Sequence, residues 1–487
     1  MVPEAGRWQV GRWRGAWRDA PVTRRRTVRF VAASAVAGLA LGTGAAAVAG
    51  PWDGGQRTAE RARAEHVRAG VGGGARHAGP QAAPVPPVLG ALRAGRGEPA
   101  GLAAALEPLL QDPALGSAGR AAAVVDALTG EKLYGSGERD AYTPASTIKL
   151  ATAAAALAAL GPEHRIATTV LGGGPDGGIV LVGGGDPTLT ARPEPGGFAS
   201  LAELADATAG ALKAHGTERV RLAYDASRYA GPALHVIGPN ENLAPVSALM
   251  VDEGRLDDSD RGPADRTADP AGDAARKFAA MLRERGVEVD GDIAEGRAQA
   301  GAPRLASVSS APLSALVERA LTNSDNDIAE ALARQTAVAG GEEASFAGAA
   351  RAVTDRLTKL GLPMDGVHIA DGSGLDRADR ATADFLARLL VRAADPGRPG
   401  LRPVLTGLPV AGFTGTLRER YAAGTGGRGL VRAKTGTLTG VNTLAGTVVT
   451  PSGRLLAFAF LASGTTDADA AQKALDRLAT TLAATAG

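Results

Sequence analysis

Apolar positions along the chain fall into runs of the lengths that strands and helices require. Residues 121–130 form a mostly apolar run that ends at a Thr-Gly turn, and residues 132–134 follow it, which predicts a β-hairpin. An alanine-rich run then continues to Leu160 and stops at a Gly-Pro pair, which predicts a helix over residues 143–160.

The same patterns predict elements further along the chain. Residues 444–450 and 454–463 flank a Pro-Ser-Gly turn and predict two strands. In the middle of the chain, residues 179–182 and 220–224 predict strands, and residues 274–285 predict a helix. A chain of 487 residues therefore has room for more than one hydrophobic core.

The first 88 residues differ from the rest. A basic leader, residues 1–29, precedes an uncharged run over residues 30–50, whose length is about what crosses a hydrocarbon core of roughly 30 Å. Arginines stay on the cytoplasmic side of a membrane, so the chain after residue 50 is expected to be extracytoplasmic. Residues 51–88 are rich in Gly, Ala, Arg and Pro and predict a flexible linker.

Two fates of residues 30–50 stay open. The run ends in Ala47-Val48-Ala49, a small-residue pattern that a signal peptidase can cut, which predicts secretion. Its length and the tryptophans of the basic leader fit an uncleaved membrane anchor, although the leader could equally be a solvated segment.

Composition excludes several kinds of catalyst and partner. The chain has no cysteine, so thiol catalysis, thiolate metal sites and disulfides are excluded. Its six histidines are scattered and none falls in an HExxH pair, so no metal site is expected. The first 78 residues carry 13 arginines and 5 acidic residues, which leaves the remaining body mildly acidic and predicts no nucleic-acid partner.

Ser146 and Lys149 stand near the start of the helix predicted over residues 143–160. Positions i and i+3 share one face of a helix, so the lysine amine can reach the serine hydroxyl. A serine becomes a nucleophile when an adjacent base takes its proton, and lysine can be that base once burial or a second cation lowers its pKa. Alone, Ser-x-x-Lys also occurs on solvated helix faces.

A second motif places Ser324 and Asn326 just before another helix. Asp327 and Glu330 resemble a capping box that opens this helix, which would leave Ser324 and Asn326 on the preceding turn. By themselves these residues could be no more than caps.

A third motif, Lys434-Thr435-Gly436, begins the strand-rich C-terminal stretch. Gly436 would let a ligand lie along this strand with no side chain in the way. Ser-x-x-Lys, Ser-x-Asn and Lys-Thr-Gly in this order are the signature set of penicillin-binding proteins and serine β-lactamases.

The surrounding residues narrow the resemblance. The chain resembles the D-alanyl-D-alanine carboxypeptidase/endopeptidase family of the penicillin-binding protein 4 type, the class C low-molecular-mass penicillin-binding proteins. Besides the three motifs, the matching stretches begin at Leu181, Ala244, Ser310, Asp371 (Asp-Gly-Ser-Gly-Leu) and Gly415 (Gly-Thr-Leu).

The resemblance implies an α/β (α+β) fold of the β-lactamase/transpeptidase type, an antiparallel sheet flanked by helices with an inserted domain between the first two motifs. The catalytic domain would comprise residues 89–165 and 306–487, and the inserted domain residues 166–305. Residues 467–484 would form a helix packed on the sheet.

The resemblance also implies catalytic roles. Ser146 would be the acylated nucleophile, Lys149 its general base, and Ser324 the residue that relays a proton to the leaving D-alanine. Asn326 would bind the substrate amide and orient Lys149.

The third motif would bind the substrate through Lys434, Thr435, Gly436 and Thr437. Lys434 would meet the terminal carboxylate and help to keep Lys149 neutral, with Thr435 as a hydroxyl contact. The backbone N–H groups of Ser146 and Thr437 would form the oxyanion hole. An aromatic residue that the family often shows before Ala244 is replaced here by Glu241-Asn242-Leu243, a departure from the family pattern at the substrate side-chain pocket.

The implied activity is a serine-type D-Ala-D-Ala carboxypeptidase, with DD-endopeptidase activity left open. It would act on peptidoglycan stem peptides, need no cofactor, and be inhibited covalently by β-lactam antibiotics. Two rivals remain: a serine β-lactamase, which would need a Glu-x-x-Leu-Asn segment not found between Ser324 and Lys434, and a non-catalytic wall-binding protein, which would need a broken motif.

Overall fold

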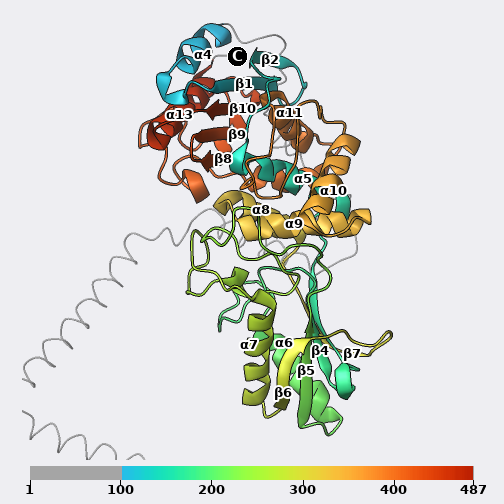
Figure 1. Ribbon diagram of the computed structural model, residues 1–487. Helices are drawn as coiled ribbons and strands as arrows, with labels where there is room; N and C mark the ends of the chain where they lie inside the picture. Colours follow the sequence, from blue (N-terminus) through green and yellow to red (C-terminus); the bar gives the residue numbers. More distant parts are fainter. Residues whose placement is uncertain (1–100, 486–487) are drawn as a thin grey trace, which may run out of the picture. The chain divides into compact units, whose positions relative to one another are not determined.

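The structure, a computed structural model, describes residues 101–485 (Figure 1). The predicted leader, membrane-targeting run and linker, residues 1–88, lie outside this range. Within residues 101–485 no helix has the length and apolarity needed to span a bilayer.

One antiparallel sheet of five strands has the order β2-β1-β10-β9-β8. The predicted hairpin is confirmed as β1 (Gly119–Asp126) and β2 (Lys132–Ser136). The two predicted C-terminal strands are confirmed as β9 (Val441–Val449) and β10 (Leu455–Ser463), and β8 (Arg432–Leu438) is the edge strand beside β9.

Side chains alternate between the two faces of this sheet, as strand geometry requires. Ala122 and Val124 of β1 face a core shared with α4 (Leu102–Leu110) and α13 (Ala468–Ala484). Ala121 and Ala123 face the larger core on the other side. The helix expected over residues 467–484 is thereby confirmed, with Asp467 as its N-cap.

Helices build the larger core. They are α5 (Lys149–Leu160), α8 (Leu313–Asn323), α9 (Asn326–Gly340), α10 (Phe346–Lys359), α11 (Ala383–Ala394) and the short α12 (Pro403–Thr406). The helix predicted over residues 143–160 begins as a 3-10 turn, η3 (Ala145–Ile148), before it continues as α5. This antiparallel sheet with helices on both faces confirms the predicted fold class.

A second, mixed sheet lies between the first two motifs in the sequence, with the order β6-β5-β4-β3-β7. Its strands are β3 (Ala167–Leu171), β4 (Ile179–Val182), β5 (Arg219–Asp225), β6 (Glu288–Glu295) and β7 (Arg304–Ser309). Parallel pairs β4–β5 and β5–β6 are connected through α6 (Leu201–Ala214) and α7 (Pro270–Glu284), which pack on the sheet in a separate core. The strands and helix predicted here are confirmed.

The predicted Asp327–Glu330 capping box is wrong. Helix α9 begins earlier, because the carboxylate of Asp325 accepts a hydrogen bond from the N–H of Ile328 and acts as the N-cap. Asn326 is therefore the first residue of α9 rather than part of a preceding turn, and Glu330 is buried.

Candidate active site

Ser146 lies on a strained turn. Ala145, which precedes it, has φ 48°, a left-handed conformation that is uncommon for a residue with a side chain. Such strain persists only where the surroundings hold it, and it is found most often at functional sites. Here the turn is enclosed from two sides, since a Cβ on Gly374 or on Gly436 would collide with the backbone of residues 144–145.

Lys149 is buried and meets Ser146 directly. Its Nζ lies 3.0 Å from Oγ of Ser146 and donates to Oδ1 of Asn326 at 2.7 Å and to the carbonyl of Ser373. Burial lowers the pKa of Lys149 to about 8, although the carboxylates of Asp371 and Glu330 act in the opposite direction. A lysine with this pKa has a substantial neutral fraction near physiological pH, as a general base requires.

Ser324 joins the second motif to the third. It follows the last residue of α8 in a left-handed conformation, φ 59°, which turns the chain sharply before Asp325 caps α9. Its Oγ accepts a hydrogen bond from Nζ of Lys434 at 2.9 Å. Lys434 also donates to the carbonyl of Thr435, and both burial and the charge of Lys149 hold the pKa of Lys434 well below its usual value. The structure thus brings the three motifs together.

The edge strand β8 presents Thr435 and Thr437 to the cavity that contains Ser146. The hydroxyl of Thr435 donates to Oγ1 of Thr416 at 2.8 Å, and Thr416 lies in the short 3-10 turn η7 (Gly415–Leu417). The structure shows a reason for glycine at position 436 besides the one expected from the sequence. A Cβ there would point away from the cavity, toward Thr443 and to within 2.6 Å of the carbonyl oxygen of Pro144. Gly436 allows the nucleophile turn to approach the strand.

The loop Asp-Gly-Ser-Gly-Leu, to which no catalytic role was assigned from the sequence, supplies part of the site. Asp371, buried and aimed back at its own loop, accepts hydrogen bonds from the backbone N–H groups of Ser373, Gly374, Leu375 and Asp376. These bonds fix the carbonyl of Ser373, which accepts from Lys149. The match of Asp-Gly-Ser-Gly-Leu to the family was the available signal.

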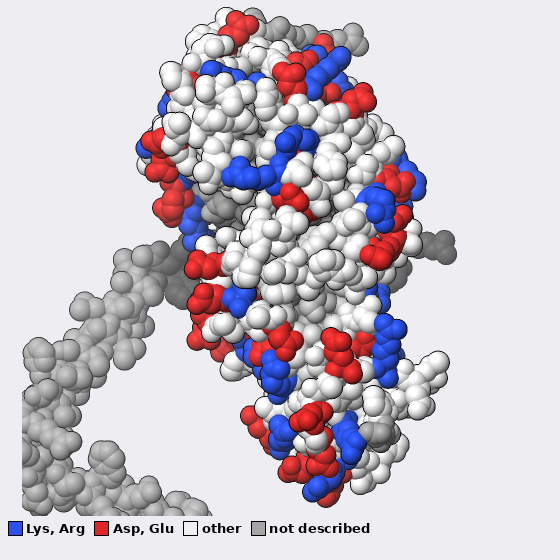
Figure 2. All heavy atoms as spheres, viewed as in Figure 1, with Lys and Arg blue, Asp and Glu red and all other residues white. Residues whose placement is uncertain are grey.

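The cavity that contains Ser146 has a volume of about 350 Å³. Its wall combines residues of the three motifs with residues of the segment between the first two motifs. The segment between the first two motifs contributes Asn242, Arg255, Arg261 and Arg266 to its wall. On the face shown in Figure 2, basic side chains are interspersed with acidic ones. Asp325 and Asp327 also border the cavity, and Arg255 and Arg266 are paired with Glu253 and Asp327, so side chains of both charges line its wall.

Two groups of buried side chains have the composition of metal ligands. They are His235 with Glu330 and Asp371, and Glu253 with Asp325 and Asp327. In both, protein groups already take ligand atoms. His235 is hydrogen-bonded to Asp371, and arginines pair with Glu253 and Asp327.

The site thus combines Ser146 on a strained turn, the buried Lys149 beside it, and a second lysine, Lys434, bonded to Ser324. This arrangement defines a serine acyl-transfer site on a β-lactamase/transpeptidase-like fold. The model of the D-Ala-D-Ala carboxypeptidase 3 (S13) family matches residues 102–261 and 259–484. The chain belongs to this family, which confirms the predicted resemblance.

Relatives agree with this assignment. The chain is 40% identical over 403 residues to a carboxypeptidase of Mycobacterium tuberculosis, covering 79% of this chain and 84% of that protein. It is 32% identical over 450 residues to the D-alanyl-D-alanine carboxypeptidase of an Actinomadura species, covering 74% and 80%. The crystal structure of penicillin-binding protein 4 from Haemophilus influenzae has the same fold, with a TM-score of 0.64 at 22% identity over 77% of this chain and 98% of that one.

Proposed function

We propose that this chain is a serine-type D-Ala-D-Ala carboxypeptidase that cleaves peptidoglycan stem peptides through an acyl-enzyme on Ser146, and that β-lactams acylate the same serine. The observation that carries this proposal is the 3.0 Å approach of Nζ of Lys149, buried and with a lowered pKa, to Oγ of Ser146. Family membership and the names of the relatives support the same activity.

Acylation begins when neutral Lys149 takes the proton of the Ser146 hydroxyl. The oxygen attacks the carbonyl carbon of the penultimate D-alanine, and the backbone N–H groups of Ser146 and Thr437 stabilise the oxyanion. The C–N bond then breaks, and the leaving amine takes a proton from Ser324, which recovers one from Lys434 through their 2.9 Å hydrogen bond. The proton on Lys149 then passes to Lys434, so that both amines regain their starting states. Neutral Lys149 takes a proton from a water molecule, whose oxygen attacks the ester carbonyl. Lys149 gives this proton to Oγ of Ser146 as the ester C–O bond breaks, and the product leaves as the free acid.

Lys434 and Thr435 receive the terminal carboxylate of the substrate. In the empty site the pKa of Lys434 is lowered by burial and by Lys149, so an arriving carboxylate favours the charged form of Lys434. Protonation of Lys434 in turn favours a neutral Lys149. Asn326 keeps a free N–H for the substrate amide, because its side-chain nitrogen carries two donors and only one bond, to the carbonyl of Asn242, is formed.

The same steps would cleave a cross-link if the leaving amine belonged to a second stem peptide. A β-lactamase would need a carboxylate to activate water at the acyl-enzyme. The carboxylates that border the cavity, Asp325 and Asp327, are held by the N–H groups of Ile328 and Ala244. We therefore expect a long-lived penicillin adduct.

An intact-mass time course of the full-length protein with excess benzylpenicillin, followed by its removal, tests the activity. A stable single adduct on Ser146 and release of D-alanine from a stem pentapeptide support a carboxypeptidase. Rapid loss of the adduct together with the antibiotic would make the protein a β-lactamase, and no adduct would make it a non-catalytic wall-binding protein.

We also propose that residues 30–50 direct the body across the membrane, either as an anchor or as a cleaved signal. The 21-residue uncharged run behind four arginines supports this. N-terminal sequencing of the mature protein and fractionation of cells distinguish the two fates. A full-length protein recovered in the cytosol contradicts both.

A further inference from the structure

Lys149 has three partners, and two of them are held by a single loop from the segment between the first two motifs. The partners are Oγ of Ser146, Oδ1 of Asn326 and the carbonyl of Ser373. Loop 235–242 contacts Asn326 directly and contacts Asp371, whose carboxylate organises the turn that bears the Ser373 carbonyl. This arrangement ties the general base to a part of the chain that supplies no reacting group.

The geometry of a neutral amine shows why these two acceptors matter. A neutral lysine has two N–H donors and one lone pair. When Asn326 and the Ser373 carbonyl accept the two N–H groups, the lone pair is left to face the hydroxyl of Ser146. An amine with only one fixed acceptor would rotate, and its lone pair would spend less time directed at the proton.

The first end of the loop acts through Asp371. Nε2 of His235 lies 2.9 Å from Oδ2 of Asp371, and both side chains are buried. The backbone N–H of Ile237 donates to Nδ1 of the same ring, which fixes the tautomer that carries the proton on Nε2. His235 therefore donates to Asp371, the carboxylate that organises the turn bearing the Ser373 carbonyl.

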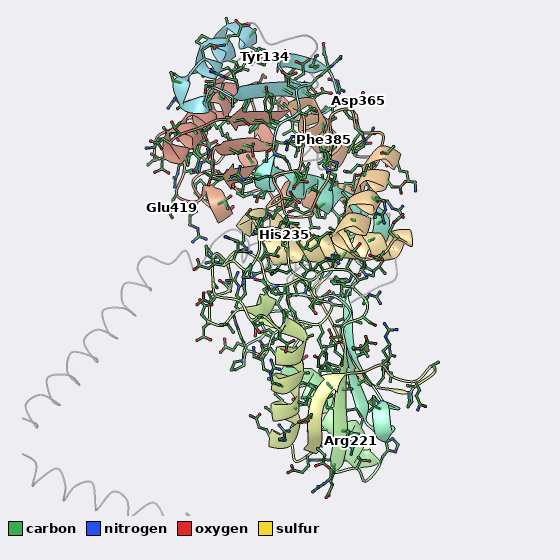
Figure 3. All side chains as sticks on the ribbon, in the orientation of Figure 1. Tyr134, Arg221, His235, Asp365, Phe385 and Glu419 are labelled. Carbon is green, nitrogen blue, oxygen red and sulfur yellow. The ribbon has the colours of Figure 1, made fainter. Side chains whose placement is uncertain are left out.

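Burial of His235 contrasts with its neighbours. Leu234 is 44% exposed and Val236 is 77% exposed, whereas His235 is 4% exposed and has its ring edge-on to Phe346 of α10. Figure 3 labels His235 below the helices of the larger core. A loop that otherwise faces solvent thus sends one polar side chain into the interior, to a charged partner. The charged groups that face this ring are Asp371, Glu330 and Asp376.

The second end of the loop acts through Asn326. The carbonyl of Asn242 accepts a hydrogen bond from Nδ2 of Asn326 at 2.8 Å, which orients the amide so that its oxygen faces Lys149. The side chain of Asn240 accepts from the N–H groups of Asn242 and Leu243 and so fixes the turn that presents this carbonyl.

We propose that loop 235–242 positions the general base, and that His235 is a positioning residue that acts on Lys149 through Asp371 and the Ser373 carbonyl. This inference rests on the proposed function, since it assumes that Lys149 activates Ser146.

The test compares three variants of the full-length protein by the rate of acylation with a fluorescent penicillin from pH 6 to pH 9. His235→Leu removes the donor to Asp371, and we expect acylation to slow about tenfold or more, with little change in the noncovalent affinity. His235→Gln places an amide N–H near the position of Nε2, and we expect recovery to within about threefold of the wild-type rate. His215→Leu, at an exposed histidine after α6, is the matched control and should acylate normally.

The pH profile separates positioning from general loss of structure. A displaced amine should lose activity across the whole profile and change the apparent pKa seen in it, whereas partial unfolding would lower only the amount of active protein. If His235→Leu does not fold, His235→Asn replaces it, because the shorter side chain falls short of Asp371 and should be slower than His235→Gln. A wild-type rate and profile in the folded Leu or Asn variant overturns the inference, while a wild-type protein that is not acylated at all contradicts the proposed function instead.

Discussion

At the scale of single residues, the site depends on a lysine held where its charge is unfavourable. Burial lowers the pKa of Lys149 to about 8, and the nearby Asp371 and Glu330 prevent a larger decrease. The pKa of Lys149 is therefore low enough for part of the amine to be neutral and high enough for that amine to accept a proton.

Acylation should depend on pH through this lysine. Only the neutral amine can take the proton of Ser146, and at pH 7 about a tenth of a lysine with a pKa near 8 is neutral. We expect the acylation rate to rise about fifteenfold between pH 6.5 and pH 8 and to level off above about pH 9. Stopped-flow measurement with a chromogenic cephalosporin checks the profile, and a rate that is flat across this range would contradict the role of Lys149.

Removal of either reacting group should abolish acylation. Ser146→Ala lacks the nucleophile, and Lys149→Ala leaves an unassisted hydroxyl that barely reacts, so we expect losses of about a thousandfold or more. Intact-mass measurement with penicillin provides the readout, and circular dichroism checks that the variants fold. Normal acylation by a folded variant of either kind would refute the assigned roles.

At the scale of elements, the site depends on how closely strand β8 approaches the nucleophile turn. This approach requires glycine at position 436, because a Cβ would lie 2.6 Å from the carbonyl oxygen of Pro144.

Gly436→Ala should therefore displace the turn that carries Ser146. We expect a loss of about 1–3 kcal/mol in the free energy of unfolding, as for overpacked sites, together with slower acylation. Gly210→Ala is the matched control, since a Cβ in the middle of α6 meets nothing within 4 Å and should be neutral or stabilising. Urea unfolding compares the two, and equal stabilities would contradict this account.

Sequence patterns were sufficient where local signals govern the structure. Strand β4 has the predicted bounds, and the helix carrying Lys149 ends at the predicted Gly161. They were insufficient where a contact between distant segments decides. Asp327 reads as a cap in sequence, yet its carboxylate accepts from the N–H of Ala244, 83 residues away in the sequence.

The same limit applies to the site itself. Ser146, Lys149, Ser324 and Lys434 follow from the motifs, because each motif is local. The Ser373 carbonyl and His235 could not be predicted as partners of the base. Every residue has a backbone carbonyl, so the sequence does not mark the one that binds Lys149, and a single histidine forms no motif with a recognisable spacing. Only the fold places them near Lys149.

At the scale of the whole molecule, the segment between the first two motifs contributes to the catalytic centre through buried charges. Arg266 pairs with Asp327 at 3.1 Å and Arg255 pairs with Glu253 at 2.9 Å, directly beside the Ser324–Asn326 motif. Burial raises the pKa of Asp327 to about 7, as it does for Glu330, with neighbouring carboxylates adding to the effect. In the folded protein these carboxyl groups therefore stay partly protonated at neutral pH, whereas in the unfolded chain they would be ionised.

Raised carboxyl pKa values should make the free energy of unfolding depend on pH in a predictable direction. A carboxyl group whose pKa is raised by folding stabilises the protein fully below its unfolded pKa, near 4, and loses that contribution as the pH rises toward its folded pKa. Burial and the charge of Asp371 raise the pKa of Asp379 to about 10, so its contribution declines across the whole range from about pH 4 to pH 10.

Asp379→Asn should remove this dependence and stabilise the protein at alkaline pH. An amide nitrogen can donate to Asp371 as the protonated acid does, and the amide oxygen can still accept from the N–H of Ala370, a bond of 2.7 Å in the wild type. The variant has no proton to acquire on folding, so we expect it to be more stable than the wild type by on the order of 1–3 kcal/mol at pH 8, with the difference shrinking toward pH 5. Urea unfolding at constant ionic strength measures this, with Asp292→Asn at an exposed carboxylate as the control for lost charge. A variant that is less stable at pH 8, or that differs from the wild type equally at both pH values, would show that Asp379 is ionised in the folded protein.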